Sequence, residues 1–224
     1  MTMPSYLLTL SALCFLLAST ASAAILRGTV HTSGVTPAAP SMNAYPGRAG
    51  SMAGMRMPPH GLASDAVLWL EHVPAAAESA LAEHPQPRPK LAQRDQCFVP
   101  RVVVIHAGGA VDFPNMDPIY HNVFSVSPAR RFDLGKYPRG QSRAIQFAKA
   151  GLVNVYCDIH SDMAAFILVV PTHAYLQPNA DGEFAFPALP AGHYTLHVWH
   201  PDLPEVMREI ELLDSGARDI EVHL

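Results

Sequence analysis

The chain has 224 residues and a formal net charge of −4, and 49% of its residues are hydrophobic while only 15% are charged. This length allows one or two domains with a substantial core, the low charge excludes a wholly disordered chain, and the slightly acidic balance gives no basic surface for nucleic acid or anionic membrane. Three cysteines cannot form a disulfide scaffold, whereas 12 histidines and 9 methionines suit a soft-metal site.

Residues 1–23 are predicted to be a cleaved signal peptide. Residues 7–18 form an apolar run that is shorter than the roughly 20 residues a helix needs to cross a bilayer. The sequence Ala21-Ser22-Ala23 follows, with the small-x-small pattern that signal peptidase recognises. We therefore expect a periplasmic mature chain that starts at Ala24 and has no membrane span. The alternative is an N-terminal anchor or a buried helix.

The sequence of the mature chain predicts an all-β fold, because its apolar runs are short, rich in β-branched residues and bounded by Pro, Gly, Asn or Asp. One segment, Ala75–Glu83, has the composition of a short helix, and the proline-rich His84–Lys90 after it is expected to be extended. The expected strands are Ile25–His31, Ala66–Val73, Phe98–His106, Ala110–Phe113, His121–Val126, Arg143–Phe147, Leu152–Tyr156, Phe166–Val170, Glu183–Phe186, Tyr194–Trp199, Met207–Leu212 and Asp219–Val222.

The stretch Thr32–Ser64 reads as a linker rich in Gly, Pro, Ser and Ala. It also contains a group of methionines with one histidine, namely Met42, Met52, Met55, Met57 and His60. Clustered thioethers on an exported segment resemble Cu(I)-collecting sequences. The simpler interpretation is a disordered insertion with no role in metal binding.

A set of soft metal ligands follows the expected strand Leu152–Tyr156. Cys157, His160 and Met163 form a C-x2-H-x2-M pattern, and His121 begins another expected strand upstream. A thiolate, two imidazoles and a thioether are the ligand set that selects copper, with methionine as a weak axial ligand. Because side chains alternate along a strand, the Cys157 thiolate can point inward at the end of a sheet.

The segment from about Leu91 to Val170 resembles the cupredoxins, the type 1 or blue copper proteins that include plastocyanin and amicyanin. The short C-x2-H-x2-M loop is similar to that of amicyanin, and the upstream matches are Phe98-Val99-Pro100, Gly108–Asn115 and His121-Asn122-Val123. The resemblance implies a Greek-key β-sandwich that holds one copper ion, and an asparagine whose amide braces the ligand loops. By the same resemblance, the equatorial ligands are His121, Cys157 and His160, the axial ligand is Met163, and the bracing residue is Asn122.

The tail resembles a carboxypeptidase regulatory-like β-sandwich in its turn and strand patterns at Asn179–Phe184 and Leu189–Leu196. Gly28-Thr29-Val30 and Ala66–Leu70 loosely match the first half of that pattern, which implies a second, smaller and discontinuous sandwich. In the alternative, Ala66–Val73 supplies the first strand of the middle domain.

The expected division is a signal peptide at 1–23, N-terminal strands at 24–74, a cupredoxin domain at 90–171 and C-terminal strands at 172–224. Most of the mature chain also resembles periplasmic proteins of the methylamine-utilisation type.

The predicted function is one-electron transport by a single copper ion, without enzymatic activity. A binuclear electron-transfer centre needs two bridging cysteines in the loop, and a multicopper oxidase needs a histidine-flanked cysteine, whereas Cys157 lies between Tyr156 and Asp158. The expected partners are redox proteins, either a dehydrogenase or a cytochrome. The alternative functions are copper binding and delivery without electron transfer, and a metal-free interaction module built on the tail.

Other interpretations of the predicted ligands stay open. A Cys97–Cys157 disulfide would remove the thiolate, and Cys157 could be a buried cysteine with incidental neighbours. Zinc is a weaker competitor because its sites rarely include methionine. The remaining histidines are expected to be mainly structural, and they include His31, His72, His106, His173, His193, His197 and His200.

Overall fold

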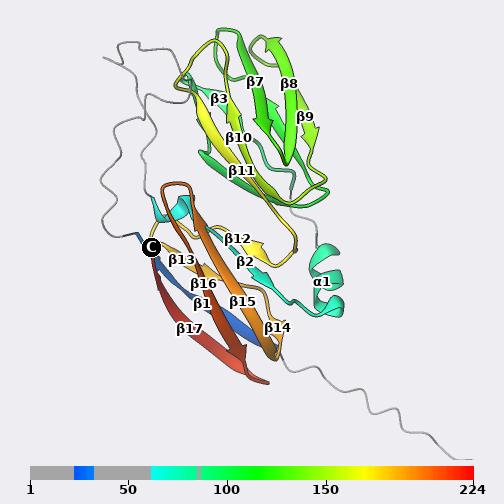
Figure 1. The fold of residues 1–224 in the computed structure, drawn as a ribbon, viewed down its shortest axis with the longest axis vertical. Coiled ribbons are helices and arrows are strands. Elements are labelled where there is room, and N and C mark those ends of the chain that lie inside the picture. Colours follow the sequence, from blue (N-terminus) through cyan, green and yellow to red (C-terminus); the bar gives the residue numbers. More distant parts are fainter. Residues whose placement is uncertain (1–22, 33–61, 85–86) are drawn as a thin grey trace, which may run out of the picture.

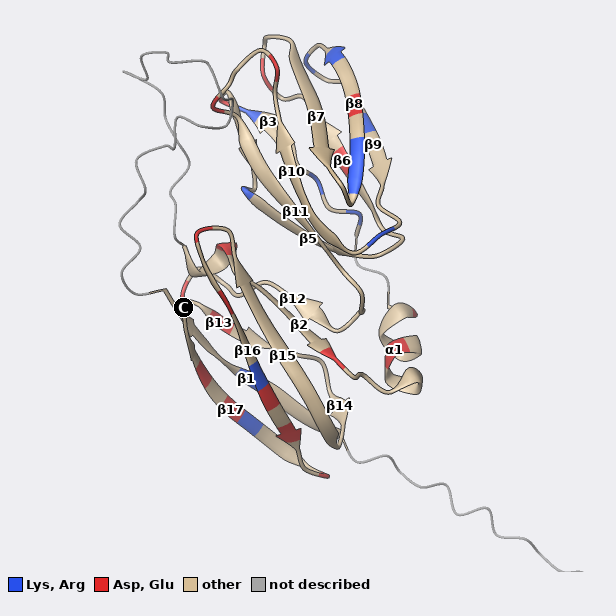
Figure 2. Ribbon diagram, viewed as in Figure 1, with Lys and Arg blue, Asp and Glu red and all other residues tan. Residues whose placement is uncertain are grey.

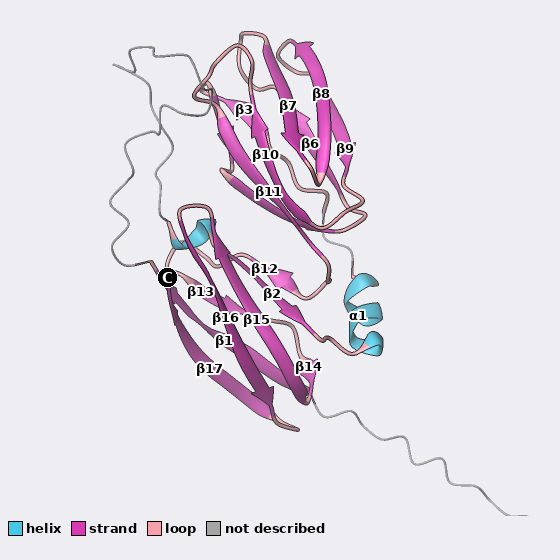
Figure 3. Cartoon of the chain, in the orientation of Figure 1, coloured by secondary structure: helices cyan, strands magenta, loops and turns pink. Residues whose placement is uncertain are grey.

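The computed structural model describes residues 23–32, 62–84 and 87–224, and these residues form a nearly all-β chain (Figure 1 and Figure 3). The predicted all-β class is therefore confirmed. The helix α1 (Ala75–Ala82) lies where the sequence predicts one, and the 3-10 turn η1 spans Ala63–Asp65. Residues 1–22 and the methionine-rich stretch 33–61 lie outside the described residues, so the predictions made for them are not tested.

The strands form two β-sandwiches, which we call the middle sandwich and the terminal sandwich (Figure 1). One face of the middle sandwich is a five-stranded sheet in the order β5-β11-β10-β7-β8, and the other contains the pairs β3-β4 and β6-β9. Its strands are β3 (Ala92–Arg94), β4 (Cys97–Val99), β5 (Val102–His106), β6 (Ala110–Pro114), β7 (His121–Ser127), β8 (Arg130–Tyr137), β9 (Ser142–Gln146), β10 (Gly151–Tyr156) and β11 (Ala164–Val170).

The terminal sandwich combines strands from both ends of the described chain. One sheet has the order β13-β1-β14, with β17 parallel to β1, and the other has the order β12-β2-β15-β16. Its strands are β1 (Ala23–His31), β2 (Val67–Glu71), β12 (Tyr175–Leu176), β13 (Glu183–Ala185), β14 (Leu189–Pro190), β15 (Gly192–His200), β16 (Leu203–Leu212) and β17 (Gly216–His223). The strand β2 pairs with β12 and β15 and so belongs to this sandwich.

Each sandwich has its own core, and a third apolar cluster joins the two. Along β11, Ile167 and Val169 point into the middle core, while Leu168 and Val170 point toward the terminal sandwich. A strand that is buried on both faces has to be apolar at successive positions, which explains the continuous apolar run seen here. The buried members of the joining cluster are Val67, Trp69, Val102, Leu168 and Val170.

One expected strand is divided in the structure, and four strands, β3, β8, β12 and β14, were not predicted. The expected strand Phe98–His106 is divided into β4 and β5 at Pro100 and Arg101, because proline has no N–H to donate to a ladder. The strand β8 was not predicted, since its sequence RRFDLGKY is strongly charged. It pairs with β7 at the edge of its sheet, where charged side chains hinder pairing with other chains.

Charge is distributed unevenly over the two sandwiches (Figure 2). Lys and Arg residues gather on β8 and β9 of the middle sandwich, and Asp and Glu residues gather along β16 and β17 of the terminal sandwich. Among the described residues, neither helical segment is long and apolar enough to span a membrane.

Candidate metal centre

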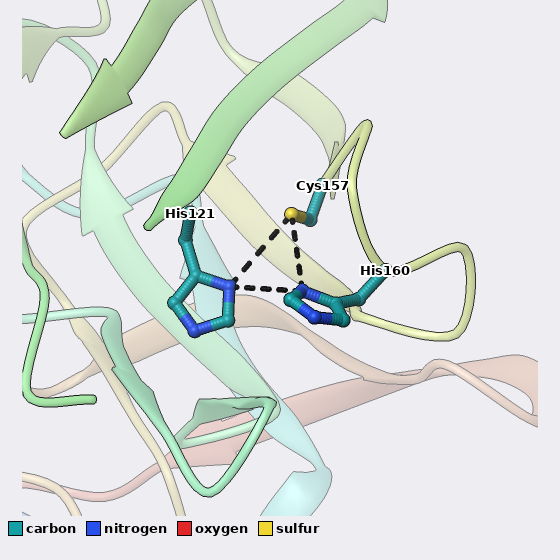
Figure 4. A group of neighbouring side chains, drawn as sticks. All are labelled: His121, Cys157 and His160. Carbon is teal, nitrogen blue, oxygen red and sulfur yellow. Dashed lines mark hydrogen bonds between the residues drawn. The ribbon is translucent and has the colours of Figure 1, made fainter. Parts of the chain in front are cut away.

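Three of the predicted ligands converge at one end of the middle sandwich (Figure 4). The Sγ atom of Cys157 lies 3.9 Å from His121 Nδ1 and 4.0 Å from His160 Nδ1, and the two Nδ1 atoms are 3.1 Å apart. His121 and Cys157 are buried, whereas His160 is partly exposed. The site therefore has a closed inner side and one imidazole near the surface.

Neighbouring strands deliver these side chains to the same point. His121 is the first residue of β7 and Cys157 directly follows β10, and the two strands pair at Phe124 and Tyr156. The register of β7 against β8 shifts between Asn122 and Phe124, next to His121. Such irregularities often re-aim a side chain beside a functional site.

The loop that follows Cys157 closes on itself. The Met163 N–H donates to the His160 carbonyl at 3.1 Å, and the Cys157 N–H donates to the Met163 carbonyl at 3.3 Å. These bonds explain how the C-x2-H-x2-M spacing returns His160 to the cysteine. Met163 is 1% exposed and packs in the same core cluster as Cys157. Its role as the fourth ligand stays a prediction.

The far side of the His121 ring meets a carboxylate that the sequence analysis did not identify. His121 Nε2 lies 2.7 Å from Asp117 Oδ2. The same carboxylate accepts backbone N–H bonds from Asp95 and Gln96, at 2.6 and 2.9 Å. Burial alone would raise the pKa of Asp117, but these hydrogen bonds together hold it below its usual value. Asp117 is thus a carboxylate at neutral pH and orients the imidazole.

The bond between Asp117 and His121 depends on a turn that lies distant in sequence. Asp95 and Gln96 link β3 to β4 with φ angles of 53° and 57°, in the left-handed region. This conformation directs two successive N–H groups at Asp117. The only local signal was an aspartate four residues before His121, and that spacing by itself does not indicate a contact.

Two asparagines connect the loops around the site. Asn122 Oδ1 accepts the Asp158 N–H at 3.4 Å, and its Nδ2 donates to Asp133 at 2.6 Å. Asn122 thus links the segments that carry His121 and Cys157, as the resemblance implied. Asn115 donates to the carbonyls of Ile119 and Tyr137, both at 2.9 Å, and so shapes the loop that leads into β7.

The electrostatic setting of His160 favours the neutral ring that metal binding requires. Burial, and then the proximity of His121, lowers the pKa of His160, although Asp117 and Asp162 act in the opposite direction. A neutral imidazole offers a lone pair to a metal at near-neutral pH.

Cys97 and Cys157 are not joined by a disulfide, although both are described. Burial, followed by the carboxylates of Asp117 and Asp95, raises the pKa of Cys97 and keeps it a thiol. Cys157 is the cysteine that lies against two histidine nitrogens.

No protein-family model and no curated protein matches the chain. A Cu-containing nitrite reductase from Thermus scotoductus SA-01 is 25% identical, with a TM-score of 0.36, over 38% of this chain and 23% of that one. Amicyanin from Paracoccus versutus is 23% identical, with a TM-score of 0.34, over 40% of this chain and 87% of that one. A mutant of amicyanin in its reduced Cu(I) form is 18% identical, with a TM-score of 0.35, over 40% and 88%. The chain spans less than a quarter of the nitrite reductase.

Proposed function

We propose that the protein is a type 1 copper protein that carries single electrons, with one copper ion held by His121, Cys157, His160 and Met163. One observation carries this proposal: a cysteine sulfur and two histidine nitrogens, from β7 and from the loop after β10, converge at one end of a β-sandwich. The axial position of Met163 is part of the proposal.

The spacing of the three donor atoms suits a metal ion. With metal–nitrogen and metal–sulfur bonds of about 2.0 and about 2.3 Å, a trigonal arrangement places two nitrogens about 3.5 Å apart and nitrogen about 3.7 Å from sulfur. The observed separations of 3.1, 3.9 and 4.0 Å lie close to these values. A thiolate with two imidazoles is a soft set that favours copper over magnesium or calcium.

Each residue has a distinct task in this proposal. Copper would supply a one-electron couple between Cu(I) and Cu(II), and the β-scaffold would limit ligand movement between the two states. Asp117 holds the His121 ring from its far side, so that the Nδ1 lone pair faces the site. His160, the partly exposed ligand, is the point where a redox partner can approach.

The surface around His160 supports a partner protein with a positively charged contact region. The ligand-bearing loops expose the apolar side chains of Ile119, Tyr120 and Ile159. Asp158 and Asp162 lie on either side of Ile159 in the Cys157–Met163 loop and add negative charge, although Asp158 is 3.9 Å from the Lys136 ammonium of β8. A mixed apolar and acidic surface favours a basic partner and disfavours an acidic one. We propose a periplasmic location, which rests on the predicted signal peptide.

The decisive experiment adds Cu(II) to the purified mature protein. We expect an intense blue absorption from thiolate-to-copper charge transfer, its loss in Cys157→Ser, and its retention in the matched control Cys97→Ser. A colourless wild-type protein, or a blue Cys157→Ser variant, would overturn the type 1 assignment.

Electron transport and copper delivery differ in whether the ion leaves. The blue protein should survive repeated reduction and reoxidation in the presence of a Cu(I) chelator, with its absorbance recovered in each cycle. Loss of copper to the chelator after the first reduction would instead support delivery.

A further inference from the structure

A second group of metal-ligating side chains lies on the terminal sandwich. His31 ends β1, while Glu221 and His223 lie near the end of β17. His31 Nε2 is 3.8 Å from Glu221 Oε2, and His223 Nε2 is 3.9 Å from the same oxygen. The two imidazole rings stack, with centroids 4.7 Å apart and planes inclined by 15°. All three donor atoms lie within 4.8 Å of one another.

The parallel pairing of β1 with β17 creates this group. His31 stands directly opposite His223, and Glu221 precedes His223 by two residues, so both side chains of β17 share a face. Val30 and Val222, which point to the other face, are 2% and 0% exposed and belong to the core. The three ligating side chains therefore point away from the core toward solvent.

An ordinary ion pair on the same face shows what distinguishes this group. Arg27 faces Asp219 across the same two strands and binds it at 2.7 Å, so that carboxylate is matched by a cation. Glu221 instead faces two imidazoles at distances beyond hydrogen bonding. Although the His31 side chain is 42% exposed, its Nε2 atom is shielded from water and has no hydrogen-bond partner among the described residues.

We propose that His31, Glu221 and His223 bind a divalent cation of the Cu²⁺ and Zn²⁺ class. Imidazole nitrogen suits both Cu²⁺ and Zn²⁺, and two histidines with one glutamate are a ligand set found in zinc sites. Bonds of about 2.0–2.2 Å would place the donors about 3.4 Å apart in a tetrahedral site. The three donor atoms, now within 4.8 Å of one another, would reach this spacing by rotation of side chains that extend into solvent, and the bound ion would coordinate His31 Nε2.

Three protein ligands leave at least one position for water, so the site would hold an exchangeable ion and not a closed structural one. The site stands independently of the proposed function, because it shares no residue with the Cys157 cluster and lies on the other sandwich (Figure 1).

The test titrates Cu(II) into the full mature chain and follows electron paramagnetic resonance. After the blue centre has filled, a second signal with the wide hyperfine splitting of nitrogen- and oxygen-ligated Cu(II) should appear without strong visible absorption. His223→Gln and Glu221→Gln should each weaken this second binding at least about tenfold, because even residues that only orient metal ligands contribute that much. The matched control His193→Gln, at an exposed histidine of β15, should leave it unchanged.

A second arm separates this inference from the type 1 proposal. Calorimetric titration of Zn(II) into the Cys157→Ser protein should show a binding event that His223→Gln removes. The inference is overturned if no second site fills with either ion, or if the second site persists undiminished in both His223→Gln and His31→Gln. A colourless wild-type protein that still shows the His223-dependent event would contradict only the type 1 assignment.

Discussion

At the scale of single residues, His121 is held on both sides of its ring. Its Nδ1 atom faces Cys157 and His160, and its Nε2 atom meets the Asp117 carboxylate at 2.7 Å. A carboxylate at that distance favours the proton on Nε2, which leaves the Nδ1 lone pair free for a metal. Asp117 therefore fixes both the tautomer and the orientation of the buried histidine.

Replacing Asp117 with Asn should weaken copper binding while preserving the blue colour. The amide keeps the shape but loses the negative charge beside His121, and outer partners of metal-bound histidines contribute about 10- to 100-fold in affinity. Competition with a copper chelator measures the change. Asp112→Asn, at a surface pair with Arg88, is the control and should leave affinity unchanged. An unchanged affinity in Asp117→Asn would contradict the positioning role.

At the scale of elements, α1 is attached to the molecule chiefly through Glu78, because the helix has no buried residue and its Leu81 packs only partly against the terminal core. The Glu78 carboxylate accepts bonds from Thr172 Oγ1 at 2.9 Å and from the His173 N–H at 2.6 Å. It also lies 2.7 Å from His173 Nδ1. The helix is thus tied to the segment that connects β11 to β12.

Glu78→Gln should destabilise the protein in a pH-dependent way. Burial alone would raise the pKa of Glu78, but the hydrogen bonds from His173 and Thr172 outweigh it and lower the pKa below 4.5. The stabilisation is therefore complete above pH 4.5 and is lost as the pH falls through the lowered value. We expect the free energy of unfolding to fall by about 1 kcal/mol at pH 7, a figure that already allows for the partial exposure of the pair. At pH 3.5 the loss should be smaller. Urea unfolding at both pH values measures the difference, with Glu83→Gln as the control.

The pairing of β1 with β17 needs a glycine at position 28. A Cβ atom there would overlap the backbone carbonyl of Ile220 on the neighbouring strand. Gly28→Ala should lower the free energy of unfolding by about 3 kcal/mol, since rigid backbone cannot yield as a side chain would. Thr29→Ala, next to it in β1, should cost less than about 1 kcal/mol. Equal effects of the two substitutions in urea unfolding would contradict the close approach.

At the scale of the whole molecule, Arg101 joins the two sandwiches. It lies between β4 and β5 of the middle sandwich, with its side chain 8% exposed, and binds Asp202 at 2.7 and 2.8 Å and Asp65 at 3.2 Å in the terminal sandwich. Its guanidinium also lies over the Phe166 ring, 5.4 Å from the centroid. Phe166 itself packs against the apolar cluster that joins the sandwiches, so the two sandwiches should unfold together.

Arg101→Met should uncouple the two sandwiches. Removing one partner of a buried ion pair costs about 3 kcal/mol, because the remaining carboxylates lose their counter-charge. Trp69 and Trp199 both lie in the joining cluster, so their fluorescence reports on the interface, while the absorbance expected of the proposed copper centre would report on the middle sandwich. The two signals should coincide during urea unfolding of the wild type and separate in Arg101→Met. Arg88→Met, at an exposed pair, should leave them coincident.

Much of the middle sandwich was predictable because its signals are local. The spacing of Cys157, His160 and Met163 lies within one short loop, and His121 begins a strand with a clear apolar pattern. The strand β8 was not predicted, because an edge strand can form backbone hydrogen bonds with one neighbour without presenting the alternating apolar face that marks a buried strand. The helix α1 was predicted from composition alone, although tertiary contacts through Glu78 hold it in place.

The sequence by itself determined the all-β class, which follows from alternation, and it identified three side chains that converge, two of which lie in one short loop. Only the tertiary structure decided which carboxylate orients His121, which acidic residues form ion pairs with Arg101, and that His31 lies beside His223. These contacts join residues from different strands and loops, and their register is set by the packing of whole sheets. The pattern within a single segment fixes which of its faces is buried, but it does not say which distant strand or loop will lie beside it.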